Sequence, residues 1–181
     1  QEGKALQVSV YSRCPVVRLE LNGNVIGEKR VSEEARLTTV FEVPYSPGTL
    51  KATGVENGKE VSAVSFTTAG VPAIIKLDAD RPVIDADGND LCYVTVAITD
   101  DNGTLVPDAE SLVNVTVTGE GVLAGVGNGN PKEMRSFQQP VCKTFRGKCL
   151  VILRSGRTKG VIKLKAESNG LASNEIIVQV R

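Results

Sequence analysis

The sequence contains no histidine, no tryptophan and a single methionine among its 181 residues. The lack of histidine removes the commonest general base and the commonest metal ligand, and it excludes Ser-His-Asp and Cys-His catalysis. The four cysteines form no Cys-x-x-Cys pair, so a zinc site is not expected either. We therefore predict no catalytic residue, no cofactor and no metal in this chain.

The sequence also lacks an excess of basic or acidic residues, and it has no long apolar stretch. Lys and Arg total 21 and Asp and Glu total 21, so the chain lacks the basic excess that binding to phosphate backbones requires. No apolar run approaches the roughly 18–20 residues that cross a bilayer. Neither nucleic acid nor a membrane is therefore an expected partner.

The chain begins with Gln1-Glu2-Gly3-Lys4, without an initiator methionine or an apolar signal core. We interpret this start as that of a mature or excised fragment. The missing targeting sequence then says nothing about the location of the parent protein.

Apolar and polar residues alternate with a period of two along most of the chain, as they do in half-buried strands. Asn22-Gly23 and Asn57-Gly58 follow such runs and suit tight hairpin turns. A helical period is missing, and Ser32–Ala35 suits one helical turn at most. Strands are expected near 6–10, 17–21, 25–30, 37–43, 50–55, 61–68, 73–79, 91–99, 112–118, 122–126, 149–154, 161–167 and 174–180.

Ala69-Gly70-Val71-Pro72 interrupts the strand pattern, because glycine and proline together break strand pairing. We predict a domain boundary here, with a small β-sandwich over residues 1–70 and a larger one over residues 71–181. Short strands separated by turn residues favour an all-β fold, with two immunoglobulin-like antiparallel β-sandwiches in tandem.

Most acidic residues fall in turns or on polar strand faces, where solvated charges belong. A pair of facing carboxylates, the minimum for glycoside hydrolysis, is therefore not expected. The stretch Asp85–Asp90 superficially resembles a calcium loop, but its glycine is fourth instead of sixth. A turn rich in Asx residues is the favoured interpretation, and a surface cation stays an alternative.

The four cysteines are too few for a disulfide scaffold in a chain of this length. Cys92 and Cys149 are expected as small buried strand residues. Cys142 and Cys149 flank a predicted hairpin and are close enough in sequence to meet. The redox state of these three and of Cys14 is left open.

The connection from Gly127 to Arg146 is the longest irregular stretch, and loops of this length are usually functional, interfacial or mobile. Its first residues, Gly127, Asn128, Gly129 and Asn130, are the candidate ligand loop. Glycines permit close backbone approach and Asn amides can hydrogen-bond sugar hydroxyls. The alternative is a glycine-rich turn that closes one end of the sandwich.

Several motifs resemble glycoside hydrolase family 2. Residues 10–23 are similar to a small β-domain that follows the catalytic barrel in that family, with its Tyr-Ser/Thr-Asn-Cys-Asp/Glu run. Arg13 and Pro15 depart from that run. The second part resembles the immunoglobulin-like C-terminal domain of the same enzymes, at residues 79–81, 86–88, 90–96, 123–129 and 145–152.

The resemblance implies that this chain is a non-catalytic accessory region of a bacterial retaining β-galactosidase acting in carbohydrate degradation. Its partner would be an upstream catalytic TIM barrel in the same polypeptide, which carries the two catalytic Glu residues. The family also implies a periplasmic or extracellular location and allows a homo-oligomer formed through the parent.

Two alternatives stay open. A carbohydrate-binding module would have a glycan as partner, but such modules usually stack sugars on exposed Trp or Tyr, and this chain has no Trp. A surface adhesin or spacer built from tandem sandwiches is the other, and further copies of the second module in the gene would favour it.

Overall fold

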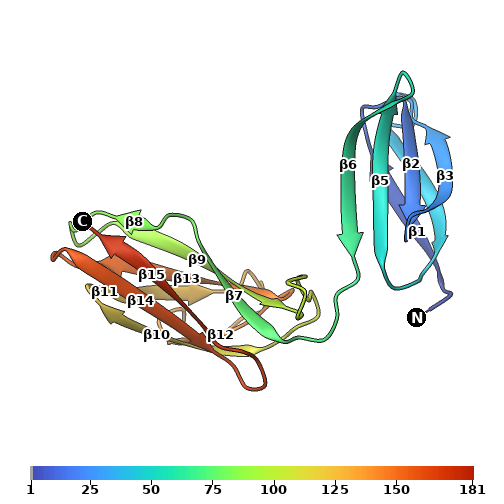
Figure 1. Cartoon of the computed structure of the whole chain (residues 1–181). Coiled ribbons are helices and arrows are strands. Elements are labelled where there is room, and N and C mark those ends of the chain that lie inside the picture. Colours follow the sequence, from blue (N-terminus) through green and yellow to red (C-terminus); the bar gives the residue numbers. More distant parts are fainter. Residues whose placement is uncertain (1) are drawn as a thin grey trace. The chain divides into compact units, whose positions relative to one another are not determined.

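The computed structural model describes residues 2–181, which are all-β and contain no helix. The chain divides into two compact units, one ending at Thr68 and the other beginning at Ala69. This division lies two residues before the boundary predicted between residues 70 and 71. Each unit consists of two packed sheets (Figure 1), so the predicted class of two β-sandwiches in tandem is confirmed.

The first unit pairs a sheet of two strands with a sheet of four, in the orders β1-β4 and β3-β2-β5-β6. Its buried core is small, because only Val17, Leu19, Phe41 and Val43 form the central cluster. The strands are β1 (Ala5–Tyr11), β2 (Val16–Leu21), β3 (Asn24–Arg30), β4 (Thr38–Pro44), β5 (Thr49–Glu56) and β6 (Lys59–Thr67).

Two hairpins in the first unit turn where the sequence predicts. Asn22 and Gly23 have φ values of 53° and 79°, and Asn57 and Gly58 have φ values of 51° and 76°. Positive φ at both central residues gives the turn whose twist matches that of paired strands. Ser32–Ala35 forms a turn in which the Ala35 amide donates to Ser32 Oγ at 3.2 Å.

The second unit packs a five-stranded sheet, β12-β10-β14-β15-β8, on a four-stranded sheet, β11-β13-β9-β7. Pairing is antiparallel except between β15 and β8 and at the isolated bridge from Ile74 to Ala172. The strands are β7 (Ile74–Ala79), β8 (Val83–Ile84), β9 (Leu91–Thr99), β10 (Leu112–Gly119), β11 (Gly121–Gly127), β12 (Val141–Lys143), β13 (Lys148–Ser155), β14 (Gly160–Glu167) and β15 (Asn174–Val180).

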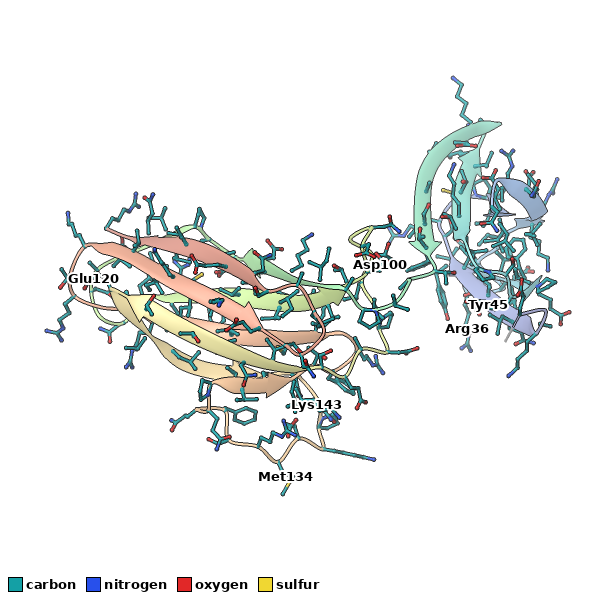
Figure 2. The ribbon with its side chains drawn as sticks, turned by 60° about the horizontal axis from the view of Figure 1, so that its bottom comes forward. Arg36, Tyr45, Asp100, Glu120, Met134 and Lys143 are labelled. Atoms are coloured by element: carbon teal, nitrogen blue, oxygen red, sulfur yellow. The ribbon has the colours of Figure 1, made fainter. Side chains whose placement is uncertain are left out.

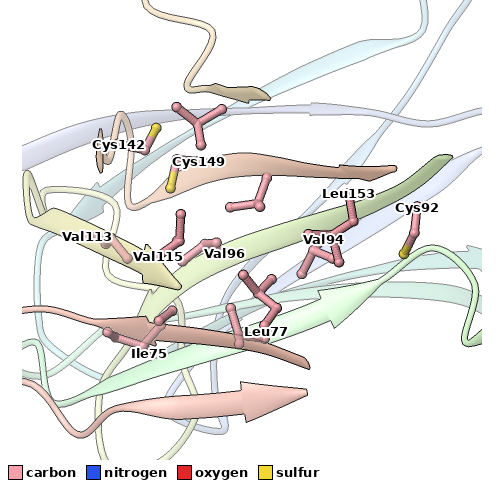
Figure 3. Close-up of a cluster of buried hydrophobic side chains, with 14 of the residues drawn as sticks. Ile75, Leu77, Cys92, Val94, Val96, Val113, Val115, Cys142, Cys149 and Leu153 are labelled. Carbon is pink, nitrogen blue, oxygen red and sulfur yellow. The ribbon is translucent and has the colours of Figure 1, made fainter. Parts of the chain in front are cut away.

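The core of the second unit follows directly from the alternation in its sequence. On β9, every second side chain from Cys92 to Ile98 is fully buried, whereas Tyr93 between them is 40% exposed. Figure 3 shows these side chains meeting those of β10 and β13 between the sheets. Burying such side chains is worth about 1.5–3 kcal/mol each, so this layer dominates the stability of the unit.

Asp100 fixes the beginning of the second unit. The residue is 4% exposed, and its carboxylate accepts hydrogen bonds from the amides of Gly70 at 2.8 Å, Asn102 at 3.0 Å and Thr104 at 2.8 Å. These donors, the Gly70 amide foremost, hold the pKa of the Asp100 carboxyl below its ordinary value. The side chain therefore ties the segment before β7 to the turn after β9.

We expect Asp100→Ala to lower the melting temperature of the second unit by several degrees at pH 7, because three amides lose their acceptor. Since the folded pKa is depressed, the stabilisation is present above the unfolded pKa of about 3.9 and is lost as pH falls through the folded value. Thermal melts from pH 7 to pH 2 should show the two proteins converging below about pH 4. Exposed Asp101→Ala is the control, and an equal effect of both substitutions would contradict this role.

Candidate functional site

The candidate ligand loop lies at the start of an excursion between two strands of the second unit. Strand β11 ends at Gly127, and β12 begins at Val141. We call the intervening residues 128–140 the β11–β12 segment. Figure 2 shows Met134 at its outer tip, and the Met134 side chain is 95% exposed.

Asn128 organises this segment from within. Its Nδ2 donates to the carbonyl of Lys143 at 2.7 Å and to Glu133 Oε2 at 3.1 Å, and its Oδ1 accepts from the amide of Asn130 at 2.9 Å. The amide group predicted to bind sugar hydroxyls is therefore already engaged inside the protein. In Asn130, Oδ1 likewise accepts from the Lys132 amide at 3.0 Å.

Glu133 completes the framework, and sequence reasoning missed it. Its Oε1 accepts from the amides of Met134 and Arg135, both at 3.1 Å. The Arg135 amide foremost, together with the Asn128 side chain, lowers the pKa of the Glu133 carboxyl. This carboxylate is held ionised by local donors, which suits a structural role better than proton transfer.

Sequence reasoning also missed Phe137, although the glycines opposite it, Gly125 and Gly127, indicated that another segment lies close to β11. The amide of Val126 donates to the carbonyl of Phe137 at 2.7 Å, so the segment returns along β11. A Cβ atom on Gly125 would lie 3.3 Å from that carbonyl oxygen, and one on Gly127 would lie 3.9 Å from the Phe137 ring. The close approach at Gly125 favours glycine at that position, whereas the contact at Gly127 is an ordinary one.

A hollow of about 420 Å³ opens beside Gly127, Asn128, Gly129 and Asn130. Phe137, which is 61% exposed, and Lys148 contribute its main aromatic and charged groups. Of the described residues that line it, none is acidic. The hollow can therefore contact an apolar or hydroxylated surface, but it lacks the paired carboxylates of a glycosidase. The role of these four residues in ligand binding stays a prediction.

The acidic turn between β8 and β9 uses its carboxylates on its own backbone. Asp87 Oδ1 accepts from the amides of Asn89 and Asp90, both at 2.8 Å, and Asp90 Oδ2 accepts from the amide of Asp85 at 2.8 Å. These amides lower the pKa of both carboxyls. This is the Asx-rich turn that the sequence favours, and residues 2–181 contain no group of three or more His, Cys, Asp or Glu placed to hold a metal.

All four cysteines are free thiols, and Cys92, Cys142 and Cys149 are buried. The predicted burial of Cys92 and Cys149 is thus confirmed, and Figure 3 shows Cys142 and Cys149 side by side. Burial raises the pKa of the Cys92 thiol to about 11. The neighbouring Cys142 side chain foremost, together with burial, raises the pKa of the Cys149 thiol. Neither Cys92 nor Cys149 has the lowered pKa of a nucleophilic thiolate.

Residues 2–181 also contain no helix with the length and apolar character needed to cross a bilayer.

The family described as glycoside hydrolase family 2 C-terminal domain 5 matches residues 75–177. The chain belongs to the C-terminal region of glycoside hydrolase family 2. A domain of unknown function, DUF4982, matches residues 3–62 and so coincides with most of the first unit. The two matches account for both sandwiches in the order that the motifs indicate.

Individual family 2 relatives show the same match over much longer chains. The beta-galactosidase BoGH2A of Bacteroides ovatus is 45% identical over 161 residues, which are 89% of this chain and 19% of that protein. The crystal structure of a family 2 member from Bacteroides cellulosilyticus is 40% identical with a TM-score of 0.96, covering 99% of this chain and 23% of the other.

A beta-glucuronidase of family 2 has the same fold at 24% identity, with a TM-score of 0.90 over 100% of this chain and 19% of the other. The chain therefore spans about a fifth of the length of the family 2 proteins that it matches.

We expect Asn128→Ala to loosen the β11–β12 segment, because the Lys143 carbonyl and Glu133 lose a donor and the Asn130 amide loses an acceptor. Each bond contributes about 1 kcal/mol, so losing these bonds raises the population of the opened segment. Trypsin should then cleave after Lys132 and Arg135 about tenfold faster or more. Mass spectrometry of timed digests measures this rate. Asn130→Ala is the control, since it removes only the bond to the Lys132 amide. Equal cleavage of both variants would contradict the role given to Asn128.

Proposed function

We propose that this chain is the non-catalytic C-terminal accessory region of a bacterial family 2 glycoside hydrolase of the β-galactosidase type. One observation carries the proposal: polar and charged groups of the β11–β12 segment, and of the acidic turn between β8 and β9, hold their own backbone. Asn128, Glu133, Asp87 and Asp90 all bind neighbouring amides or carbonyls. These four side chains thus support the local fold of their own segments.

The catalytic groups of the parent are assigned to a barrel upstream of this chain. The matched relatives are four to five times longer than their matched regions, which leaves room for such a domain. A retaining family 2 enzyme needs one Glu as acid and base and a second Glu as nucleophile, about 5–5.5 Å apart. The relative named as a beta-galactosidase supports a β-galactoside as the substrate of the parent.

The accessory role itself is stabilisation of the parent, either by packing against its other domains or by forming an oligomer interface. The first unit supports this role because it has few fully buried side chains for a unit of its size. A small core gains from further burial against a neighbour. We also place the parent in the periplasm or outside the cell, as the resemblance to the family implies.

Removing residues 1–181 from the parent enzyme is expected to lower its melting temperature or to change its oligomeric mass. Calorimetry measures the melting temperature, and light scattering measures the oligomeric mass. The value of kcat/KM on p-nitrophenyl β-galactoside measures turnover. A second truncation that removes only residues 69–181 assigns the effect to one unit. The separate chain should not hydrolyse the substrate. Unchanged stability, assembly and turnover in both truncations would contradict the accessory role.

A glycan-binding role is the second candidate, and the exposed Phe137 beside its hollow is the observation that favours it. The engaged amide of Asn128 argues against it, because sugar binding needs free polar groups next to the aromatic face. We expect calorimetric titration of the chain with galactose and β-galacto-oligosaccharides to give no saturable heat. Saturable binding that Phe137→Ala abolishes would replace the accessory role with this one.

A further inference from the structure

The first unit is a sandwich with unequal layers, and part of its larger sheet has no cover. Cross-strand pairing places Leu19, Ala52 and Val64 in one row across β2, β5 and β6. Leu19 in that row is fully buried, whereas Val64 is 50% exposed although it shares the same face. The facing sheet has only β1 and β4, so it covers the β2 side and leaves the β6 side open.

The next row shows the same gradient. Leu21 pairs with Leu50, and Leu50 pairs with Phe66 on β6, whose side chain is 71% exposed. A phenylalanine on the inner face of a sandwich sheet is normally among its most buried residues. The inner face of β6 is thus built as a core surface that no described residue covers.

The uncovered face forms the floor of a groove between β1 and β6. Three adjoining hollows of about 230, 140 and 270 Å³ follow it. They are continuous, because Val8, Leu50 and Phe66 line the first and third, and Val10 and Val64 line the second and third. None of the described lining residues carries a charge. The groove therefore suits an apolar occupant and does not suit a charged ligand.

One wall of the groove is a strand edge with unused hydrogen-bonding capacity. Strand β1 pairs with β4 along one edge, and among the described residues no strand pairs with its other edge. Ser9 and Tyr11 of β1 line the groove, and Tyr11 is 77% exposed. Folded proteins normally cover or pair such an edge, because open edges recruit other strands.

The chain turns immediately before β1. Gly3 has a φ of 81°, and its amide donates to the carbonyl of Tyr45 at 2.9 Å. A short turn with glycine at positive φ is the usual connection between two antiparallel neighbouring strands. Polypeptide that reaches this turn from upstream is therefore in a position to run antiparallel to β1.

We propose that the groove of the first unit is filled by one extended strand from the parent polypeptide directly upstream of Glu2, paired antiparallel with the free edge of β1. Its alternate side chains are apolar and pack on Val64 and Phe66. The added strand extends the smaller sheet from two strands to three. Sheets pack about 10 Å apart, so a strand beside β1 lies above β6. This inference rests on the proposed membership of the chain in a longer polypeptide, but not on any catalytic activity.

The test compares the chain of residues 1–181 with the same chain extended by about twelve upstream residues of its parent, the length of one strand and its turn. The extension should raise the melting temperature of the first unit by about 5 °C or more, a shift typical of a modest stability gain in a small domain. Hydrogen exchange should slow at β1 amides that do not bond to β4. Unchanged melting and exchange would overturn the proposal and leave the accessory role intact.

Val64→Asp and Val61→Asp give a matched pair on β6, since the two side chains are 50% and 54% exposed and of the two only Val64 lines the groove. In the chain of residues 1–181 the two substitutions should have similar, small effects. In the extended chain Val64→Asp should cancel the gain in melting temperature, and Val61→Asp should leave it unchanged. Equal effects in the extended chain would overturn the proposal.

A second copy of this chain is the competing occupant. Sedimentation of residues 1–181 over a wide concentration range distinguishes it. A dimer that Val64→Asp dissociates, and that persists in the extended chain, would assign the groove to self-association and overturn the upstream strand.

Discussion

The burial of every second side chain between two sheets is the constraint on which this protein depends. In the second unit, β9 and β13 present their inward residues to β10 and β14, and almost none of that layer reaches solvent. A shift of pairing by one residue would move the inward side chains of each strand to the solvent face. The register is therefore fixed by the same side chains that provide the stability. The polar residues between them are then left on the surface or in turns, where several of them hold backbone amides and carbonyls.

The sequence predicted the long strands well because alternation over six or more residues is an unambiguous pattern. It missed β8 and β12, whose two and three residues are too short to show a period. β12 depends on contacts distant in sequence, since it pairs with β10 across Val113 and Cys142. The parallel contact of β8 with β15 likewise joins residues 96 positions apart, such as Val83 and Gln179, and no local signal encodes such a pairing.

For the candidate loop, residue types alone could not decide between ligand binding and turn formation. Glycines and asparagines are equally suited to hydroxyl recognition and to turn formation, and only the partners of each atom separate the two. The structure gives those partners for Asn128: the Lys143 carbonyl of β12, and the Glu133 carboxylate and Asn130 amide of its own segment. Gly125 opposite the Phe137 carbonyl was the clue in the sequence, because small residues in a strand often mark the close approach of another backbone.

The bonds that hold the β11–β12 segment determine where this surface tolerates change. Asn128 and Glu133 hold the backbone of this segment, whereas the Met134 side chain is 95% exposed and is no part of the buried core. Lengthening a surface loop at such a point costs little chain entropy, about 0.6 kcal/mol for each doubling of its length. The tip at Met134 is thus a natural position for an insertion, a fluorescent label or an affinity tag that leaves the sandwich beneath it undisturbed.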